Sequence, residues 1–291
     1  MELINKLSKT VVIIFFGIFA FFYAFANIFF TVHLDQTISF DKGITFASVV
    51  CLFGLLFILY YLIKKDFFQI KEEYLLCVFL IISLIVGMTW IFVNDIELRD
   101  LDDAYNCYRA ACNIAHGNLE PLSYKSYISV YPNNIGLVTY LLIHIKLFGE
   151  FGALYSIRIV NLVFVLLGYF ALYRISKIIF NNRAVNCTLI VLMFGSMQFV
   201  FFSFFVYGNC LSYSMSLLSV MFLLSYLEDN KISGLILSSL FIIGSISIKQ
   251  NSLIILIAES ILLIICFINT KKVIIIIVLI FTISGVYIGT S

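Results

Sequence analysis

Long apolar segments alternate with short polar turns along this sequence, and they limit the folds that it can adopt. A helix needs about 20 apolar residues to cross a bilayer, and it satisfies its own backbone hydrogen bonds, as lipid requires. We predict about nine such helices. They are Thr10–Val32, Ile44–Ile63, Tyr74–Val93, Leu154–Ser176, Val185–Val206, Cys210–Leu227, Ile232–Ile248, Leu253–Ile268 and Val273–Gly289.

The composition supports a membrane protein over a soluble one. The 291 residues are 63% hydrophobic and only 12% charged, whereas a soluble domain is about half apolar and about a quarter charged. A globule in water has no means of burying so much apolar surface, so lipid must be the solvent. The segments are long and continuous, unlike the short alternating strands of a membrane β-barrel. We therefore expect an all-α, polytopic transmembrane helical bundle.

The lysines and arginines between the segments predict their orientation, because cytoplasmic loops are enriched in these residues. Lys6 and Lys9 place the N-terminus inside. The alternation then places three further basic clusters inside, which are Lys64 to Lys71, Arg174 to Arg183, and Lys271 with Lys272. Lys249 is the exception, since it falls at an outer helix end. The sequence thus predicts a multi-pass protein of the cell membrane.

The same pattern predicts three parts. Residues 1–93 form three N-terminal transmembrane helices, residues 94–153 an extracytoplasmic loop with interfacial helices, and residues 154–291 the rest of the bundle. Within the loop, Asn133–Phe148 is short and amphipathic, as is typical of a helix at the outer interface. The chain ends at an apolar run, Val286–Ser291, so we expect a natural short form or an incomplete product.

An acidic pair, Asp102 and Asp103, opens a predicted amphipathic helix that ends near Gly117. One interpretation is helix capping, which stabilises a helix by about 1 kcal/mol through free N–H groups and the dipole. The other is chemical: an ionised carboxylate above an apolar bundle can take a proton from an acceptor hydroxyl or hold a divalent cation. The sequence leaves both open, and a metal is undetermined.

The order of motifs resembles the GT-C class of glycosyltransferases. Its nearest members are the dolichyl-phosphate-mannose protein mannosyltransferases and the lipid A aminoarabinose transferase. The resemblance extends from about Leu101 to about Leu256. It rests on an ordered set of features, which are Asp102-Asp103, the helix ending at Gly117, Tyr131-Pro132-Asn133, Phe148-Gly149, Arg158 and Lys249. The chain differs from the family in its second Asp, its single proline and its three preceding spans.

The resemblance implies a hexosyltransferase that moves a sugar from a polyprenyl-phosphate donor to a glycan, lipid or protein acceptor by an inverting single displacement. It implies Asp102 as the catalytic base with Asp103 beside it. Tyr131 and Asn133 are expected to contact substrate, although tyrosines here also fit an aromatic belt. Arg158 and Lys249 are expected to neutralise the lipid phosphate. No nucleic-acid partner is expected.

Other interpretations stay open. Arg158 could instead reach the lipid headgroups, as arginines near helix ends commonly do. A polysaccharide polymerase or ligase also combines many spans with one large outer loop. A transporter would have paired intramembrane charges and broken helices in two matching halves. The sequence has one clear mid-span acid, Glu259, for which no partner is evident.

Overall fold

The computed structural model describes residues 71–94, 98 and 103–290, together with a few positions between 31 and 61. The chain divides into two compact units, Met1–Gln69 and Ile70–Ser291. In the first unit, β1 (Thr31–Val32) pairs antiparallel with β2 (Ile38–Ser39). The end of the first predicted span is therefore strand. The rest of that span, most of Ile44–Ile63, and Asp102 lie outside the described residues.

In the second unit all regular secondary structure of the described residues is helical, as predicted. Its helices are α3 (Glu72–Val93), α4 (Asp103–Ala115), α5 (Tyr127–Val130), α6 (Ile135–Phe180), α7 (Arg183–Gly195), α8 (Gln198–Phe202), α9 (Asn209–Asp229), α10 (Ile232–Ile248), α11 (Leu253–Thr270) and α12 (Val273–Thr290). Short 3-10 turns connect them at η1 (Glu120–Leu122), η2 (Pro132–Asn134) and η3 (Gln250–Ser252).

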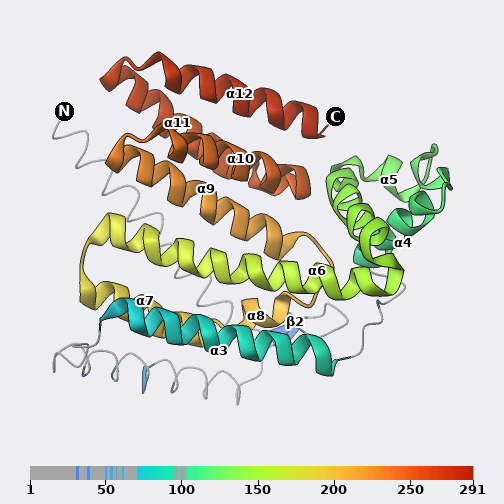
Figure 1. Cartoon of the computed structure of the whole chain (residues 1–291), viewed down its shortest axis with the longest axis horizontal. Coiled ribbons are helices and arrows are strands. Elements are labelled where there is room, and N and C mark those ends of the chain that lie inside the picture. The colour runs from blue at the N-terminus through green and yellow to red at the C-terminus, as the bar shows by residue number, and fades with distance from the viewer. Residues whose placement is uncertain are drawn as a thin grey trace. The chain divides into compact units, whose positions relative to one another are not determined.

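The long helices lie side by side in a bundle (Figure 1). Helix α9 packs between α6 and α10, while α3 and α7 cover another side of α6, and α12 packs on α10 and α11. Helices α4 and α5 gather with the start of α6 at one end of this bundle (Figure 1). The predicted outer loop thus folds as a cap of short helices.

The bundle exposes large apolar side chains and buries several polar ones. Ser219 and Ser245 are fully buried and Glu259 is 4% exposed, whereas Ile254 and Tyr287 are more than two-thirds exposed. Water would penalise such an outer surface, but hydrocarbon favours it. Four helical segments in the described part are long and apolar enough to cross a membrane, namely Glu72–Val93, Pro132–Phe180, Asn209–Asp229 and Gln250–Thr270.

Three further apolar helices are shorter: Arg183–Gly195, Ile232–Ile248 and Val273–Tyr287. The prediction of one continuous span at Val185–Val206 is wrong. Helix α7 ends at Gly195, and the hydroxyl of Tyr169 donates a hydrogen bond of 2.6 Å to the carbonyl oxygen of Ser196. That tertiary contact satisfies a helix-end carbonyl, so the chain can turn before α8 within an unbroken apolar stretch.

Helix α6 joins two segments that the sequence predicted separately, Asn133–Phe148 and Leu154–Ser176. They meet at Gly149, whose φ is 71° and ψ is 170° inside the helix. Glycine adopts positive φ without the steric cost that a side chain incurs. Helix α6 thus links the cap to the bundle (Figure 1), with its kink at Gly149.

Two close contacts at glycines bring the cap, α9 and α10 together. A Cβ on Gly136, at the start of α6, would overlap the carbonyl oxygen of Ser247 near the end of α10. A Cβ on Gly208, just before α9, would overlap the side chain of Ile248. The cap, the start of α9 and the end of α10 therefore meet at one place, next to Lys249.

Candidate functional site

Asp103, the first residue of α4, is exposed and is held by the segment that precedes η2. Its Oδ1 accepts a hydrogen bond of 2.8 Å from the hydroxyl of Tyr127. The Tyr127 oxygen in turn accepts a hydrogen bond of 3.1 Å from Nδ2 of Asn134. Burial raises the pKa of Tyr127, and its bond to Asp103 raises it further. Tyr127 thus stays protonated and keeps donating to the carboxylate.

Helix α4 is anchored at its other end and along one face. It buries Cys107, Tyr108 and Ala111, in agreement with the predicted apolar face for the last two. The Tyr108 hydroxyl donates to the carbonyl oxygen of Glu150, and Nζ of Lys146 donates to the carbonyl oxygen of Ala115 at 2.9 Å. A cation at a helix C-terminus is favourable. This packing leaves the N-terminus of α4 directed at the bundle.

Lys249 approaches the same region from α10, where it follows the last helical residue. Its ammonium donates a hydrogen bond to Oδ1 of Asn209 and lies 4.4 Å from the centroid of the Tyr207 ring. Burial lowers the pKa of Lys249, and the charge of Asp103 partly opposes this by raising it.

Asp103 lines a cavity of about 590 Å³ that we call the aromatic cavity. Three phenylalanines, Phe199, Phe202 and Phe205, supply apolar wall, and Tyr207, Asn209 and Tyr213 supply the polar groups. Pockets for small molecules have this composition, with mostly apolar walls and a few placed polar groups. Among its described lining residues, Asp103 is the only carboxylate.

Lys249 lines a different cavity of about 370 Å³, which we call the lysine cavity. Its polar lining includes Asn209, Asn251 and Ser252, and its apolar lining includes Val220 and Ile254. Asn209 and Tyr213 line both cavities. The first turns of α9 thus form a partition with a carboxylate on one side and an ammonium on the other.

Arg158 lies behind the aromatic cavity rather than on its surface. The side chain is 1% exposed, its guanidinium lies 3.7 Å from the centroid of the Phe204 ring, and its Nε donates a 2.9 Å hydrogen bond to the Phe204 carbonyl oxygen. One turn on, Asn161 donates to the carbonyl oxygens of Ser203 and Phe205. The Arg158 side chain is therefore buried against the segment that follows α8 instead of facing the surface.

The other predicted site residues are distributed unevenly. Tyr131 and Asn133 are exposed beside the site and are not among the described lining residues of either cavity. Instead Tyr127 contacts Asp103, and Asn134 donates to the Tyr127 hydroxyl. The Tyr207–Asn209 turn lies beside Lys249. The aromatic and amide residues near Pro132 in the sequence could have pointed to Tyr127 and Asn134. The turn before α9 is uncharged, and nothing in the sequence indicated that it lies beside Lys249.

A divalent cation stays a prediction. The described residues contain no group of three or more His, Cys, Asp or Glu side chains that could hold a metal ion. Asp102, which lies outside that part, is adjacent in sequence to Asp103 and is the residue to test.

The chain matches no protein-family model, no curated protein and no solved structure.

Proposed function

We propose that this protein is a multi-pass membrane glycosyltransferase of the GT-C type, with residues 94–153 on the extracytoplasmic side. It transfers a sugar from a polyprenyl-phosphate donor to an acceptor at that surface. One observation carries the proposal: a carboxylate, Asp103, and an ammonium, Lys249, converge from two elements on the shared partition of Asn209 and Tyr213.

Such a transfer needs a group that accepts a proton and a group that stabilises a leaving phosphate. The acceptor hydroxyl loses its proton to the carboxylate while its oxygen forms a new bond to the anomeric carbon. The bond between that carbon and the phosphate oxygen breaks, and polyprenyl phosphate leaves with the electron pair. Lys249 faces the charge that develops there. A single displacement of this kind inverts the anomeric centre.

Asp102 is the proposed base, following the resemblance, and Asp103 is its partner. Tyr127 is a positioning residue, since its hydrogen bond fixes Asp103 against the cap. The rigid attachment of α4 supplies the alignment that bimolecular reactions otherwise lack. Cys107 is excluded as a nucleophile in this scheme, because burial raises the pKa of its thiol to about 12.

The transporter alternative would assign Glu259 to an ion path. In the structure the Ser219 hydroxyl lies 2.7 Å from Oε1 of Glu259 and 2.9 Å from the Ser238 carbonyl oxygen, so its one hydrogen can be donated to either acceptor. These contacts join α9, α10 and α11, and interhelical hydrogen bonds of this kind stabilise membrane bundles. Packing thus accounts for Glu259 without a transport role.

The test uses the purified full chain in proteoliposomes that contain radiolabelled polyprenyl-phosphate hexoses and a membrane extract as acceptor. We expect wild type to release polyprenyl phosphate and to transfer label. Asp102→Asn should lower the rate by about 100-fold or more, which is the usual contribution of a general base. Glu120→Gln, an exposed acid in the same loop, is the matched control and should retain activity. Equal rates for all three proteins would overturn the proposal.

A further inference from the structure

We infer that the acceptor is itself a membrane lipid whose hydrocarbon part lies in the aromatic cavity and its inward continuation, while the donor lipid lies on the opposite side of α9. This inference rests on the proposed function, and it names the acceptor class that the sequence left open.

The walls of the aromatic cavity favour hydrocarbon. Phe199, Phe202 and Phe205 form apolar surface directly beside Asp103. A peptide or a polysaccharide would have to bury amide or hydroxyl groups against these rings, and each buried polar group without a partner costs roughly 1–3 kcal/mol. A lipid chain has no such groups, so only its headgroup hydroxyl needs to meet the carboxylate.

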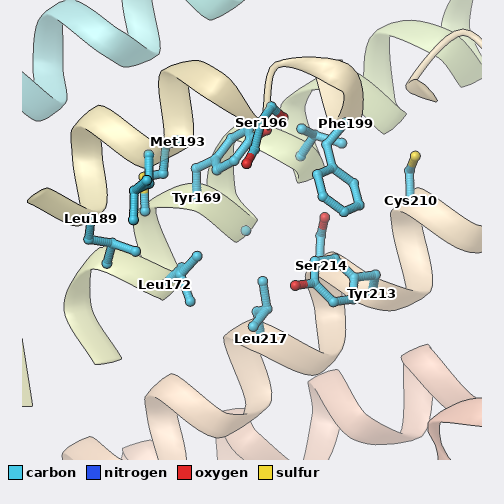
Figure 2. Close-up of a pocket in the computed structure, with 13 residues that line it drawn as sticks. Tyr169, Leu172, Leu189, Met193, Ser196, Phe199, Cys210, Tyr213, Ser214 and Leu217 are labelled. Atoms are coloured by element: carbon cyan, nitrogen blue, oxygen red, sulfur yellow. Dashed lines mark hydrogen bonds between the residues drawn. The ribbon is translucent and has the colours of Figure 1, made fainter. Parts of the chain in front are cut away.

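The cavity continues into the bundle. A second cavity of about 210 Å³, the inner cavity, shares Phe199, Cys210 and Tyr213 with it. Figure 2 shows these three residues on one side and Leu172, Leu189 and Met193 on the other. Apolar cavities of about 150 Å³ hold a benzene molecule. The inner cavity therefore has room for the end of a hydrocarbon chain.

A stacked pair of rings marks the junction of the two cavities. The rings of Phe199 and Tyr213 lie 5.5 Å apart at an interplanar angle of 6°, and both residues line both cavities. Phe199 belongs to the short helix α8, which exists because the chain breaks at Ser196. Hydropathy did not predict this break, and the break places Phe199 between the aromatic cavity and the inner cavity.

The donor is assigned to the other side of α9 by charge. The lysine cavity combines Lys249, Asn251 and Ser252 with the apolar residues Val220 and Ile254 of α9 and α11. A cation with neutral donors suits a phosphate, and an adjacent apolar wall suits a prenyl chain. Because the acceptor must contact the base and the leaving phosphate must contact the cation, the acceptor belongs in the aromatic cavity.

Two substitutions fill the inner cavity. Leu172→Phe and Leu189→Phe add volume at half-buried positions that line it. Leu262→Phe on α11 makes the same chemical change at a position that is 43% exposed and lines none of these cavities. Thermal unfolding of each variant in detergent identifies any that fail to fold, and Val165→Ile, which adds one methylene group at another lining position, then replaces them.

The experiment uses full-length protein in proteoliposomes that contain a mixture of radiolabelled polyprenyl-phosphate hexoses as donors. Three acceptors are tested in parallel, which are a total lipid extract, a membrane-protein extract and a water-soluble oligosaccharide mixture. We expect label in a new organic-soluble lipid. The products of the two inner-cavity variants should carry shorter hydrocarbon chains by mass spectrometry, with at least a fivefold loss of long-chain product. Leu262→Phe should match wild type.

Label in protein or in oligosaccharide would overturn the lipid acceptor and leave the transferase proposal standing. Unchanged chain lengths in both inner-cavity variants would overturn the assignment of the inner cavity. Failure to cleave the donor with any acceptor would overturn the transferase itself, and the inference with it.

Discussion

The hydroxyl of Tyr127 donates a 2.8 Å hydrogen bond to Oδ1 of Asp103, across 24 positions of the chain. This bond ties the first residue of α4 to the segment that enters α6. It also gives the site an orientation, because the carboxylate is held at the wall of the aromatic cavity by a donor that burial keeps protonated.

Replacing Tyr127 with Phe removes that donor, and with it the acceptor for Nδ2 of Asn134. Hydrogen bonds to charged groups contribute about 1.5–3 kcal/mol, so we expect the transfer rate to fall by roughly tenfold to a hundredfold. The loss should fall on kcat rather than on the KM for donor, since the lysine cavity is untouched. Tyr124→Phe, at an 88% exposed position, is the control. Steady-state kinetics in proteoliposomes measure kcat and KM for the two variants. An unaltered kcat for Tyr127→Phe would contradict a positioning role.

We expect activity to have an alkaline limit that is set by Lys249. Its pKa is lowered by burial, so the ammonium loses its proton at a lower pH than an exposed lysine does. Because the proposed role needs the charged form, kcat/KM should fall as pH rises through this lowered pKa. Lys249→Arg should extend activity to higher pH, since a guanidinium stays charged.

The charge of Asp103 should also affect the alkaline limit set by Lys249. Asp103 raises the pKa of Lys249, so Asp103→Asn should move the alkaline limb of the pH–rate profile to lower pH in whatever activity remains. A limb that stays in place in this variant would mean that the two charges are not coupled.

Gly136 tests how the cap is docked. A methyl group there would overlap the carbonyl oxygen of Ser247, and overpacking of this kind costs about 1–3 kcal/mol. Gly136→Ala should therefore lower the thermal unfolding temperature in detergent and expose the loop between α4 and α6 to proteases. At Gly195 an added Cβ meets nothing within 4 Å, so Gly195→Ala should do neither. Equal protection of this loop from proteases in the two variants would contradict the docking of the cap through Gly136.

Ser245 tests the polar contacts inside the bundle. It is fully buried, and its hydroxyl lies within 3.0 Å of the hydroxyls of Ser212, Ser216 and Ser252. Interhelical hydrogen bonds in membranes average about 0.6 kcal/mol and reach about 1.7. Ser245→Ala should lower the free energy of unfolding in bicelles by an amount in that range. Ser225→Ala removes a hydroxyl that bonds within its own helix and should cost less.

Local properties of the chain were enough to predict much of the bundle. Helix α10 matches its predicted span at both ends, and α3, α9 and α11 match theirs within two residues. Hydropathy works here because each helix satisfies its own backbone, so an apolar run of sufficient length determines a helix without reference to its neighbours. Gly117, with a φ of 84°, likewise ends α4 where the sequence predicts.

Only the tertiary structure decided which side chains meet. Ser196 interrupts an apolar run because Tyr169 of another helix binds its carbonyl oxygen, and Arg158, predicted at an outer helix end, is buried against Phe204. Tyr127 meets Asp103, and Lys249 meets Asn209, across dozens of positions. Hydropathy and charge are sums over neighbours in sequence, whereas a site is a set of directional contacts between distant residues, and these exist only after the helices have packed.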